Sequence, residues 1–292
     1  MDEHAIEVTA GERFEFGANW DRFLKTLDEA RITEAERSLR EMLECKDLRG
    51  RSFLDVGCGS GLFSLAARRM GATVHSFDFD PRSVACAREL RERFHPDDPA
   101  WSVAPGSVLD REYLAKLGAY DVVYSWGVLH HTGAMWQALE NVVPLVAHRG
   151  QLFIAIYNDQ GRVSRQWRWV KRTYNRLPRP LRFLVVVPSA LALWWRSIVK
   201  DLVTLRPFAS FRGYGRQRGM ALGSDLIDWV GGYPFEVATP GAIFDFFRAR
   251  GFSLSRLVTT QDHGCNQFVF VRGAAGARSQ DPLAPSCPSS SP

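Results

Sequence analysis

Apolar and polar positions alternate along this chain in a way that predicts a regular succession of strands and helices. Short apolar or β-branched runs predict strands at 52–56, 72–77, 101–104, 121–125, 150–157, 252–259 and 266–272. Segments with helical spacing predict helices at 61–70, 82–94, 133–147, 164–177 and 240–250. This alternation indicates a doubly wound α/β sheet of seven strands with right-handed crossovers. The last two strands are joined tightly through Asp262-His263-Gly264, so we predict that the final strand is antiparallel.

The same pattern divides the chain into four regions. They are a helical N-terminal cap (1–49), the alternating α/β domain (50–157 plus 240–272), a mostly helical insertion between strands five and six (158–239) and a tail (273–292). Ala, Gly, Ser and Pro dominate the tail, which we predict to be disordered. In open sheets of this kind, ligands bind beyond the carboxyl ends of the strands, so the loops that follow the strands are the candidate site.

The first such loop is a glycine-rich turn, Asp55-Val56-Gly57-Cys58-Gly59-Ser60-Gly61. Glycines let the backbone approach a ligand closely, and the helix N-terminus behind them faces it. A dinucleotide-binding turn needs its third glycine one residue later than Gly61. Asp55 also ends the strand, where a carboxylate repels a pyrophosphate but attracts a cationic ligand. The turn therefore indicates a nucleoside without phosphates that carries a positive charge.

A second acid follows at the end of the next strand. Asp78 comes 23 residues after Asp55, and an acid about 20 residues beyond such a turn accepts hydrogen bonds from ribose hydroxyls. Asp80-Pro81 has the composition of a helix N-cap followed by proline in the first turn. We therefore assign Asp78 to the ligand and Asp80 to the helix start.

The run Asp55–Gly61 resembles motif I of the class I methyltransferases, which use S-adenosyl-L-methionine. The resemblance covers roughly 50–157 and 240–272 and implies a Rossmann-like fold. Gly106-Ser107-Val108 stands where that family often has Gly-Asp-Ala beside the adenine, and the serine is a departure from the pattern. The run 125–132, Ser-Trp-Gly-Val-Leu-His-His-Thr, resembles motif IV of small-molecule O- and C-methyltransferases, nearest the ubiquinone-biosynthesis group.

The resemblance, together with the turn, predicts the cofactor-binding residues. They are Asp55, Gly57, Cys58, Gly59, Gly61, Asp78, Phe79, Ser107, Val108, Ser125, Trp126 and Trp20. The aromatic faces of Trp20 and Trp126 are expected to steady the cationic sulfur. No metal ligand is predicted, because the five cysteines are odd in number and show no C-x-x-C spacing.

Candidate catalytic groups are few, because a sulfonium methyl is already activated and the enzyme has mainly to align the reacting atoms. His130 and His131 are candidates for a base that removes a proton from the acceptor. The alternative for each is a hydrogen bond that fixes the loop, and we favour that role for at least one of the pair. Glu236 and His263 are further candidates, because turn chemistry does not account for them.

Net charge is distributed unevenly. Residues 161–220 hold 14 Lys/Arg and one acid, a balance of +13, whereas the rest of the chain has 23 basic and 31 acidic residues, a balance of −8. The segment 183–195 of this basic region carries no charge, and Trp194 and Trp195 end it. Pro188 is expected to interrupt this apolar run. Basic segments with tryptophan are typical of membrane interfaces, so 161–220 is expected to meet an anionic membrane surface. Packing on the catalytic domain or a dimer contact is the alternative.

The sequence thus predicts a methyltransferase that acts on a small or lipid-like acceptor, at oxygen. The alternatives are an RNA methyltransferase that uses the basic insertion, and a non-catalytic protein that binds S-adenosylmethionine. Nucleic acid is disfavoured because the uncharged run is poor for that role and no Asn/Asp-Pro-Pro-aromatic motif follows the fourth strand. Cysteine usage and the absence of an apolar leader predict a cytoplasmic location, with peripheral contact at the inner face of the membrane.

Overall fold

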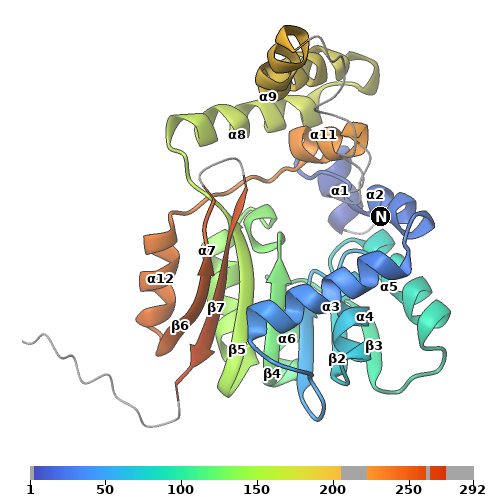
Figure 1. Ribbon diagram of the computed structural model, residues 1–292, viewed down its shortest axis with the longest axis vertical. Helices are drawn as coiled ribbons and strands as arrows, with labels where there is room; N and C mark the ends of the chain where they lie inside the picture. Colours follow the sequence, from blue (N-terminus) through green and yellow to red (C-terminus); the bar gives the residue numbers. More distant parts are fainter. Residues whose placement is uncertain (1–2, 205–221, 261–263, 274–292) are drawn as a thin grey trace, which may run out of the picture.

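The computed structural model describes residues 3–204, 222–260 and 264–273. Seven strands form one sheet in the order β3-β2-β1-β4-β5-β7-β6 (Figure 1). Their bounds are β1 Ser52–Val56, β2 Thr73–Asp78, β3 Trp101–Pro105, β4 Tyr120–Trp126, β5 Val146–Tyr157, β6 Phe252–Val258 and β7 Cys265–Arg272. The strands from β3 to β5 pair in parallel, and β7 is antiparallel to both β5 and β6. The predicted doubly wound seven-stranded sheet with an antiparallel last strand is confirmed.

Two layers of helices cover the sheet, because successive strand residues point to opposite faces. On β1, Phe53 faces a core with helices α3, α4 and α5, and Leu54 faces a core with α6, α7 and α12. The bounds of these helices are α3 Glu29–Leu43, α4 Leu62–Arg69, α5 Pro81–Phe94, α6 Arg111–Leu117, α7 Met135–Val142 and α12 Pro240–Arg248. Because the sheet packs between these two apolar cores, the ends of its strands are held in place.

The remaining helices lie beyond the carboxyl ends of the strands (Figure 1). The N-terminal cap contains α1 Glu3–Thr9 and α2 Gly17–Lys25. The insertion contains α8 Arg162–Arg176, α9 Phe183–Val203 and α11 Leu222–Gly231. A third apolar cluster joins these parts, because Phe14 of the cap packs with Tyr174 of α8 and with Leu226 and Val230 of α11.

The structure differs from the sequence-based expectation in the insertion. Pro188 was expected to interrupt the apolar run, but α9 continues through it for 21 residues. A proline inside a helix removes one hydrogen bond to the carbonyl four residues earlier, here that of Leu184. Leu184 is an exposed residue, so this carbonyl lies on the solvent side of the helix, where the loss costs least. None of the helices in the described part of the chain is long and apolar enough to cross a membrane.

Two further expectations changed at the ends of elements. The fifth strand begins at Val146, four residues before the predicted start, and the preceding helix α7 is shorter than predicted. Helix α1 was not singled out by the sequence pattern. The region 274–292, which is most of the expected disordered tail, lies outside the described residues.

Candidate functional site

A large cleft lies at the carboxyl ends of β1, β2, β4 and β5. It has a volume of about 1450 Å³, and its walls come from the strand ends, the N-terminal cap and helices α9 and α11. Ligand sites that hold one small molecule usually measure about 300–1,000 Å³. The cleft is therefore large enough for two ligands side by side.

The glycine-rich turn after β1 forms the floor of this cleft. Gly57, Gly59 and Gly61 all have positive φ values, of 76°, 54° and 81°. A Cβ on Gly57 would lie 2.3 Å from Cγ1 of Val128, so here glycine is required by the neighbouring loop as well as by φ. On Gly59 a Cβ would lie 3.0 Å from the Trp20 indole. From the sequence, these glycines were expected to let a ligand approach the backbone closely. In the structure, a Cβ at each of them would also lie close to another part of the protein.

Gly61 has a different role from its two neighbours. It is the N-cap residue of α4, and a Cβ there would meet the Cα of Ala87 in α5 at 3.0 Å. It does not line the cleft. Gly61 thus lets α4 pack against α5, and its part in cofactor binding stays a prediction.

Two carboxylates face the cleft from the ends of β1 and β2, the buried Asp55 and the partly buried Asp78. Asp55 is 2% exposed and accepts a hydrogen bond of 2.5 Å from Oγ of Ser64. Asp78 accepts hydrogen bonds of 2.9 Å from the backbone N–H groups of Gly59 and Asp80. Neither carboxylate forms an ion pair with any residue of the described chain.

Burial controls the protonation of both groups. It raises the pKa of Asp55 to about 7, against the opposing effect of the Ser64 hydrogen bond. It also raises the pKa of Asp78 to about 6, against the effect of its backbone hydrogen bonds. A cation bound in the cleft would favour the charged forms and lower both values. This pair of carboxylates therefore makes the cleft a site for a positively charged ligand.

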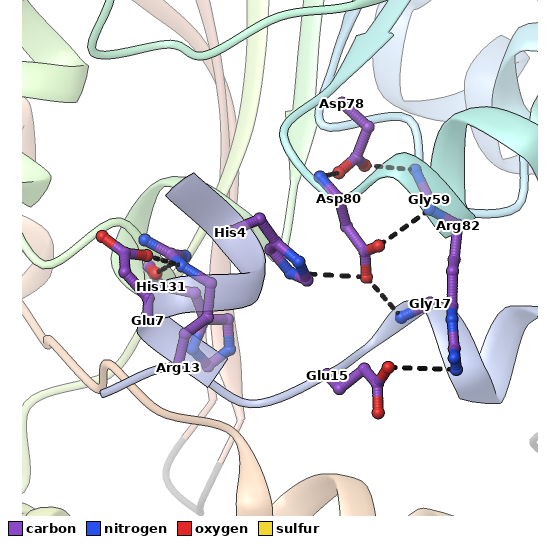
Figure 2. A network of polar contacts seen from close by, with 10 residues as sticks. All are labelled: His4, Glu7, Arg13, Glu15, Gly17, Gly59, Asp78, Asp80, Arg82 and His131. Atoms are coloured by element: carbon purple, nitrogen blue, oxygen red, sulfur yellow. Dashed lines mark hydrogen bonds and ion pairs between the residues drawn. The ribbon is translucent and has the colours of Figure 1, made fainter. Parts of the chain in front are cut away.

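The N-terminal cap is fastened over the turn by a network of polar contacts (Figure 2). Asp80 accepts hydrogen bonds from the N–H groups of Gly17, at 2.8 Å, and Arg82, at 2.9 Å. Nε2 of His4 lies 3.6 Å from the same carboxylate, and Arg82 forms an ion pair of 3.0 Å with Glu15. Asp80 thus caps α5, as predicted, and also holds the cap, which the sequence did not show.

A second contact ties the cap to the loop after β4. The guanidinium of Arg13 donates a hydrogen bond of 2.9 Å to the carbonyl oxygen of His131 and forms an ion pair with Glu7 (Figure 2). It also lies over the ring of Phe79. His4, Glu7 and Arg13 line the cleft, and sequence analysis missed all three. The signal available was weak, since only an alternation of charged and aromatic residues in 3–20 marks this segment.

The two loop histidines have different environments. Nδ1 of His131 is 2.6 Å from the carbonyl oxygen of Pro234, so Nδ1 carries the proton and Nε2 is left as an acceptor. His131 lines the cleft, whereas His130 is fully buried and does not. Burial lowers the pKa of His131 to about 3 and that of His130 well below its usual value. Both rings are therefore neutral at physiological pH.

The other predicted site residues fall into three groups. Those that line the cleft are Asp55, Gly57, Cys58, Gly59, Asp78, Phe79, Ser107, Val108, Trp126 and Trp20. Ser125 and Glu236 do not line it: Ser125 donates a hydrogen bond to the carbonyl of Val56, and Glu236 accepts one from the N–H of Met135 at the start of α7. These contacts give both residues a structural role. His263 lies outside the described residues, and the described residues contain no cluster that could hold a metal ion.

Beside the turn, the cleft has a mostly aromatic lining from β4, β5, α9 and α11. Of its residues, the sequence predicted Trp126 for the cofactor site, and it did not predict Tyr157, Trp194, Leu226 and Trp229. Tyr157 packs edge-on against Trp229, with ring centroids 5.5 Å apart. This half of the cleft fits an apolar or aromatic molecule.

Comparison with known proteins agrees with this geometry. A family model described as "Methyltransferase domain" matches residues 54–152. A ribosomal protein L11 methyltransferase of Methylococcus capsulatus is 39% identical over 71 residues, which is 24% of this chain and 24% of that protein. A tRNA U34 carboxymethyltransferase of Pseudomonas savastanoi is 34% identical over 152 residues, 51% of this chain and 45% of that protein. The chain thus spans less than half the length of these curated relatives.

Solved structures give the same fold over most of the chain. Magnesium protoporphyrin IX methyltransferase from Synechocystis, with bound SAH, has a TM-score of 0.51 at 15% identity and covers 88% of this chain and 95% of its own. An O-methyltransferase family protein from Burkholderia thailandensis has a TM-score of 0.52 at 12% identity and covers 85% and 58%. Residues 54–152 are therefore a methyltransferase domain, and the chain has the fold of the class I S-adenosylmethionine-dependent methyltransferases.

Proposed function

We propose that this protein transfers a methyl group from S-adenosylmethionine to an oxygen of a small, largely apolar or lipid-like acceptor. The observation that carries the proposal is the pair of carboxylates at the ends of β1 and β2, the buried Asp55 and the partly buried Asp78, which have no cationic partner in the described part of the chain. A nucleoside with an ammonium and a sulfonium group supplies the missing positive charge, whereas a dinucleotide adds negative charge.

Each part of the turn has a role in holding this cofactor. Asp55 lies where it can receive the α-ammonium group, and Asp78 lies where it can accept hydrogen bonds from the ribose, with its own orientation fixed by Gly59 and Asp80. The indole of Trp20 covers the turn at Gly59. When bound, the cofactor supplies a methyl group that is already activated for transfer.

The chain's own contribution to the transfer is alignment and exclusion of water. The aromatic half of the cleft orients the acceptor toward the turn. Nε2 of His131 is an acceptor at the border between the two halves, and we assign it the hydrogen bond that orients the acceptor hydroxyl. Because its pKa is about 3, His131 is a weak base, so an acidic hydroxyl such as a phenol suits the site best.

The experiment that tests the cofactor is calorimetric titration of the full chain with S-adenosylmethionine, with NADH as the control. Binding of the first and not of the second supports the proposal, and preference for NADH or binding of neither contradicts it. Formation of S-adenosylhomocysteine in the presence of a lipid extract then tests catalysis, and distinguishes an enzyme from a protein that only binds the cofactor.

A second function is favoured by one observation, the 34% identity with tRNA U34 carboxymethyltransferases over 152 residues. Under this alternative the basic insertion holds RNA, because arginine pairs with phosphates and aromatic rings stack on bases. A labelled-methyl assay on total RNA beside the lipid extract separates the two. Label in RNA alone would replace the small-molecule proposal.

A further inference from the structure

The outer face of helix α9 is an exposed apolar stripe with no counterpart elsewhere among the described helices. Leu184, Leu191, Trp195 and Leu202 follow one another at intervals of seven, four and seven and are 54–73% exposed. Residues separated by four or by seven lie on the same side of a helix, so the stripe follows most of the length of α9. In Figure 1 α9 is the outermost layer of the molecule, above α8. Apolar patches of this extent usually mark a contact surface.

The charge around this stripe indicates what it meets. Residues 162–204 contain ten Lys/Arg and a single acid, Asp201, which is buried. Four exposed cations are Arg172 and Arg176 on α8, Arg179 in the connection, and Lys200 on α9. In the described part of the chain, no ion pair joins any of these four to a carboxylate. Their charge is therefore available to an external anion.

The composition of α9 matches that of an interfacial helix. Its 21 residues are about 31 Å long at 1.5 Å per residue, and no described helix meets the requirements for crossing a membrane. An apolar face with Trp and Leu, flanked by Lys and Arg, is the composition of helices that lie in the plane of a bilayer. We infer that α9 docks flat on an anionic lipid bilayer, with its stripe among the acyl chains and the four cations at the headgroups.

The opposite face of the same helix connects this surface to the cleft. Leu193 and Trp194 line the cleft, and both pack in the cluster that joins α8, α9 and α11. One helix therefore faces lipid on one side and the aromatic half of the cleft on the other. Resting on the proposed function, this arrangement identifies the acceptor class as an amphipathic molecule that partitions into the bilayer and enters the cleft beside α9.

The test is flotation of the full chain, without cofactor, on vesicles of phosphatidylcholine alone and of phosphatidylcholine mixed with phosphatidylglycerol. We expect binding to the anionic vesicles that weakens as salt is added. Leu191→Glu, which puts a charge in the stripe, should lower the partition coefficient by about tenfold or more. Arg172→Glu and Arg176→Glu should each lower it by at least about fivefold, since each basic residue near the surface contributes about 1 kcal/mol.

Leu257→Glu is the matched control, because Leu257 is also an exposed leucine but lies on β6, at the edge of the sheet. It should float as the wild type does. The proposal is overturned if the wild type does not bind anionic vesicles at low salt, or if Leu191→Glu floats as well as the wild type. It is also overturned if the stripe instead mediates a dimer, seen by light scattering, that Leu191→Glu dissociates and that does not bind lipid.

Vesicle binding and cofactor binding can be measured separately. Titration with S-adenosylmethionine should give the same affinity for the wild type and for Leu191→Glu, since Leu191 is exposed and does not line the cleft. A wild type that binds the cofactor but does not float on anionic vesicles overturns the membrane inference alone. A wild type that floats but does not bind the cofactor overturns the proposed function alone. Retention of RNA by the wild type, lost in the arginine variants and without vesicle binding, assigns the basic surface to nucleic acid and overturns the membrane inference.

Discussion

The turn after β1 and the insertion α8–α9–α11 line the same cleft but are built differently. The turn is made of backbone in conformations that favour glycine, and it lies at the end of a buried strand, next to the buried Asp55 and the partly buried Asp78. The insertion is a helical layer held by its own apolar cluster and by contacts with the cap. The cofactor half of the cleft is therefore specified by residues that are close together in the sequence, whereas the acceptor half depends on packing between distant segments.

The largest expected effect is at the turn. Gly57→Ala places a Cβ 2.3 Å from Val128 at a φ of 76°, which should destabilise the fold by about 3 kcal/mol through overpacking and backbone strain. It should also remove cofactor binding. Gly241→Ala is the control, because a Cβ there meets nothing within 4 Å. Thermal unfolding and calorimetry measure both effects, and a stable Gly57→Ala variant with normal affinity would contradict the geometry.

Asp55→Asn should have opposite effects on the stability of the apo-protein and on its affinity for the cofactor. The amide removes a desolvated carboxyl whose pKa is about 7, so at pH 8 the apo-protein should become more stable. Cofactor affinity should fall by about 2 kcal/mol, because a hydrogen bond between charged groups is lost. Asp245→Asn, at an exposed position on α12, should change neither. Equal affinity in Asp55→Asn and the wild type would remove Asp55 from the ammonium site.

The raised pKa values of Asp55 and Asp78 predict how cofactor binding depends on pH. The folded apo-protein keeps protons on Asp55 and Asp78 up to about pH 7 and 6, whereas these groups ordinarily release them near 3.8. The folded state thus binds more protons between these values, and the apo-protein should lose stability as the pH rises from 4 to 7. A bound cation favours the charged forms, so the increase in melting temperature caused by S-adenosylmethionine should be larger at pH 8 than at pH 5.5. The opposite trend would contradict the assignment.

His131→Ala is a test at the border between the two halves. If Nε2 orients the acceptor, kcat should fall by about tenfold, the value of one hydrogen bond, with little change in cofactor affinity. Because the pKa of His131 is about 3, the wild-type rate should show no histidine step between pH 5 and 8. Equal losses in kcat and cofactor affinity would instead give His131 a purely structural role.

The smallest effect on the cofactor half should come from the insertion. Lys171 of α8 is fully buried, with its ammonium over the rings of Trp229 and Phe235. Lys171→Met keeps the aliphatic stem and removes the charge, so it should alter the affinity for the acceptor while changing that for S-adenosylmethionine by less than about twofold. Trp229→Ala, which removes the ring in contact with Lys171, is the matched variant that disturbs the packing of the same helical layer. A large loss of cofactor affinity in Lys171→Met would show that the two halves are coupled.

The sequence predicted the sheet and the cofactor half because both depend on neighbours along the chain. Alternating apolar runs define the strands, and Asp55 and Asp78 stand next to the turn that they serve. Arg13 and His4 were missed because their partners, His131 and Asp80, are 118 and 76 residues away, so no local pattern marks them. Glu236 was chosen for its polarity, but its carboxylate serves α7. Pro188 was weighed by propensity alone, without knowing that its turn of helix faces outward.

The strap formed by residues 3–17 has a consequence for turnover. It is held near both ends by Asp80, through His4 and Gly17, and between them by the carbonyl of His131, through Arg13. We expect these fastenings to slow the departure of a spent nucleoside from the cleft, so that Glu15→Ala, which removes the ion pair with Arg82, would speed its release although it is remote from the chemistry.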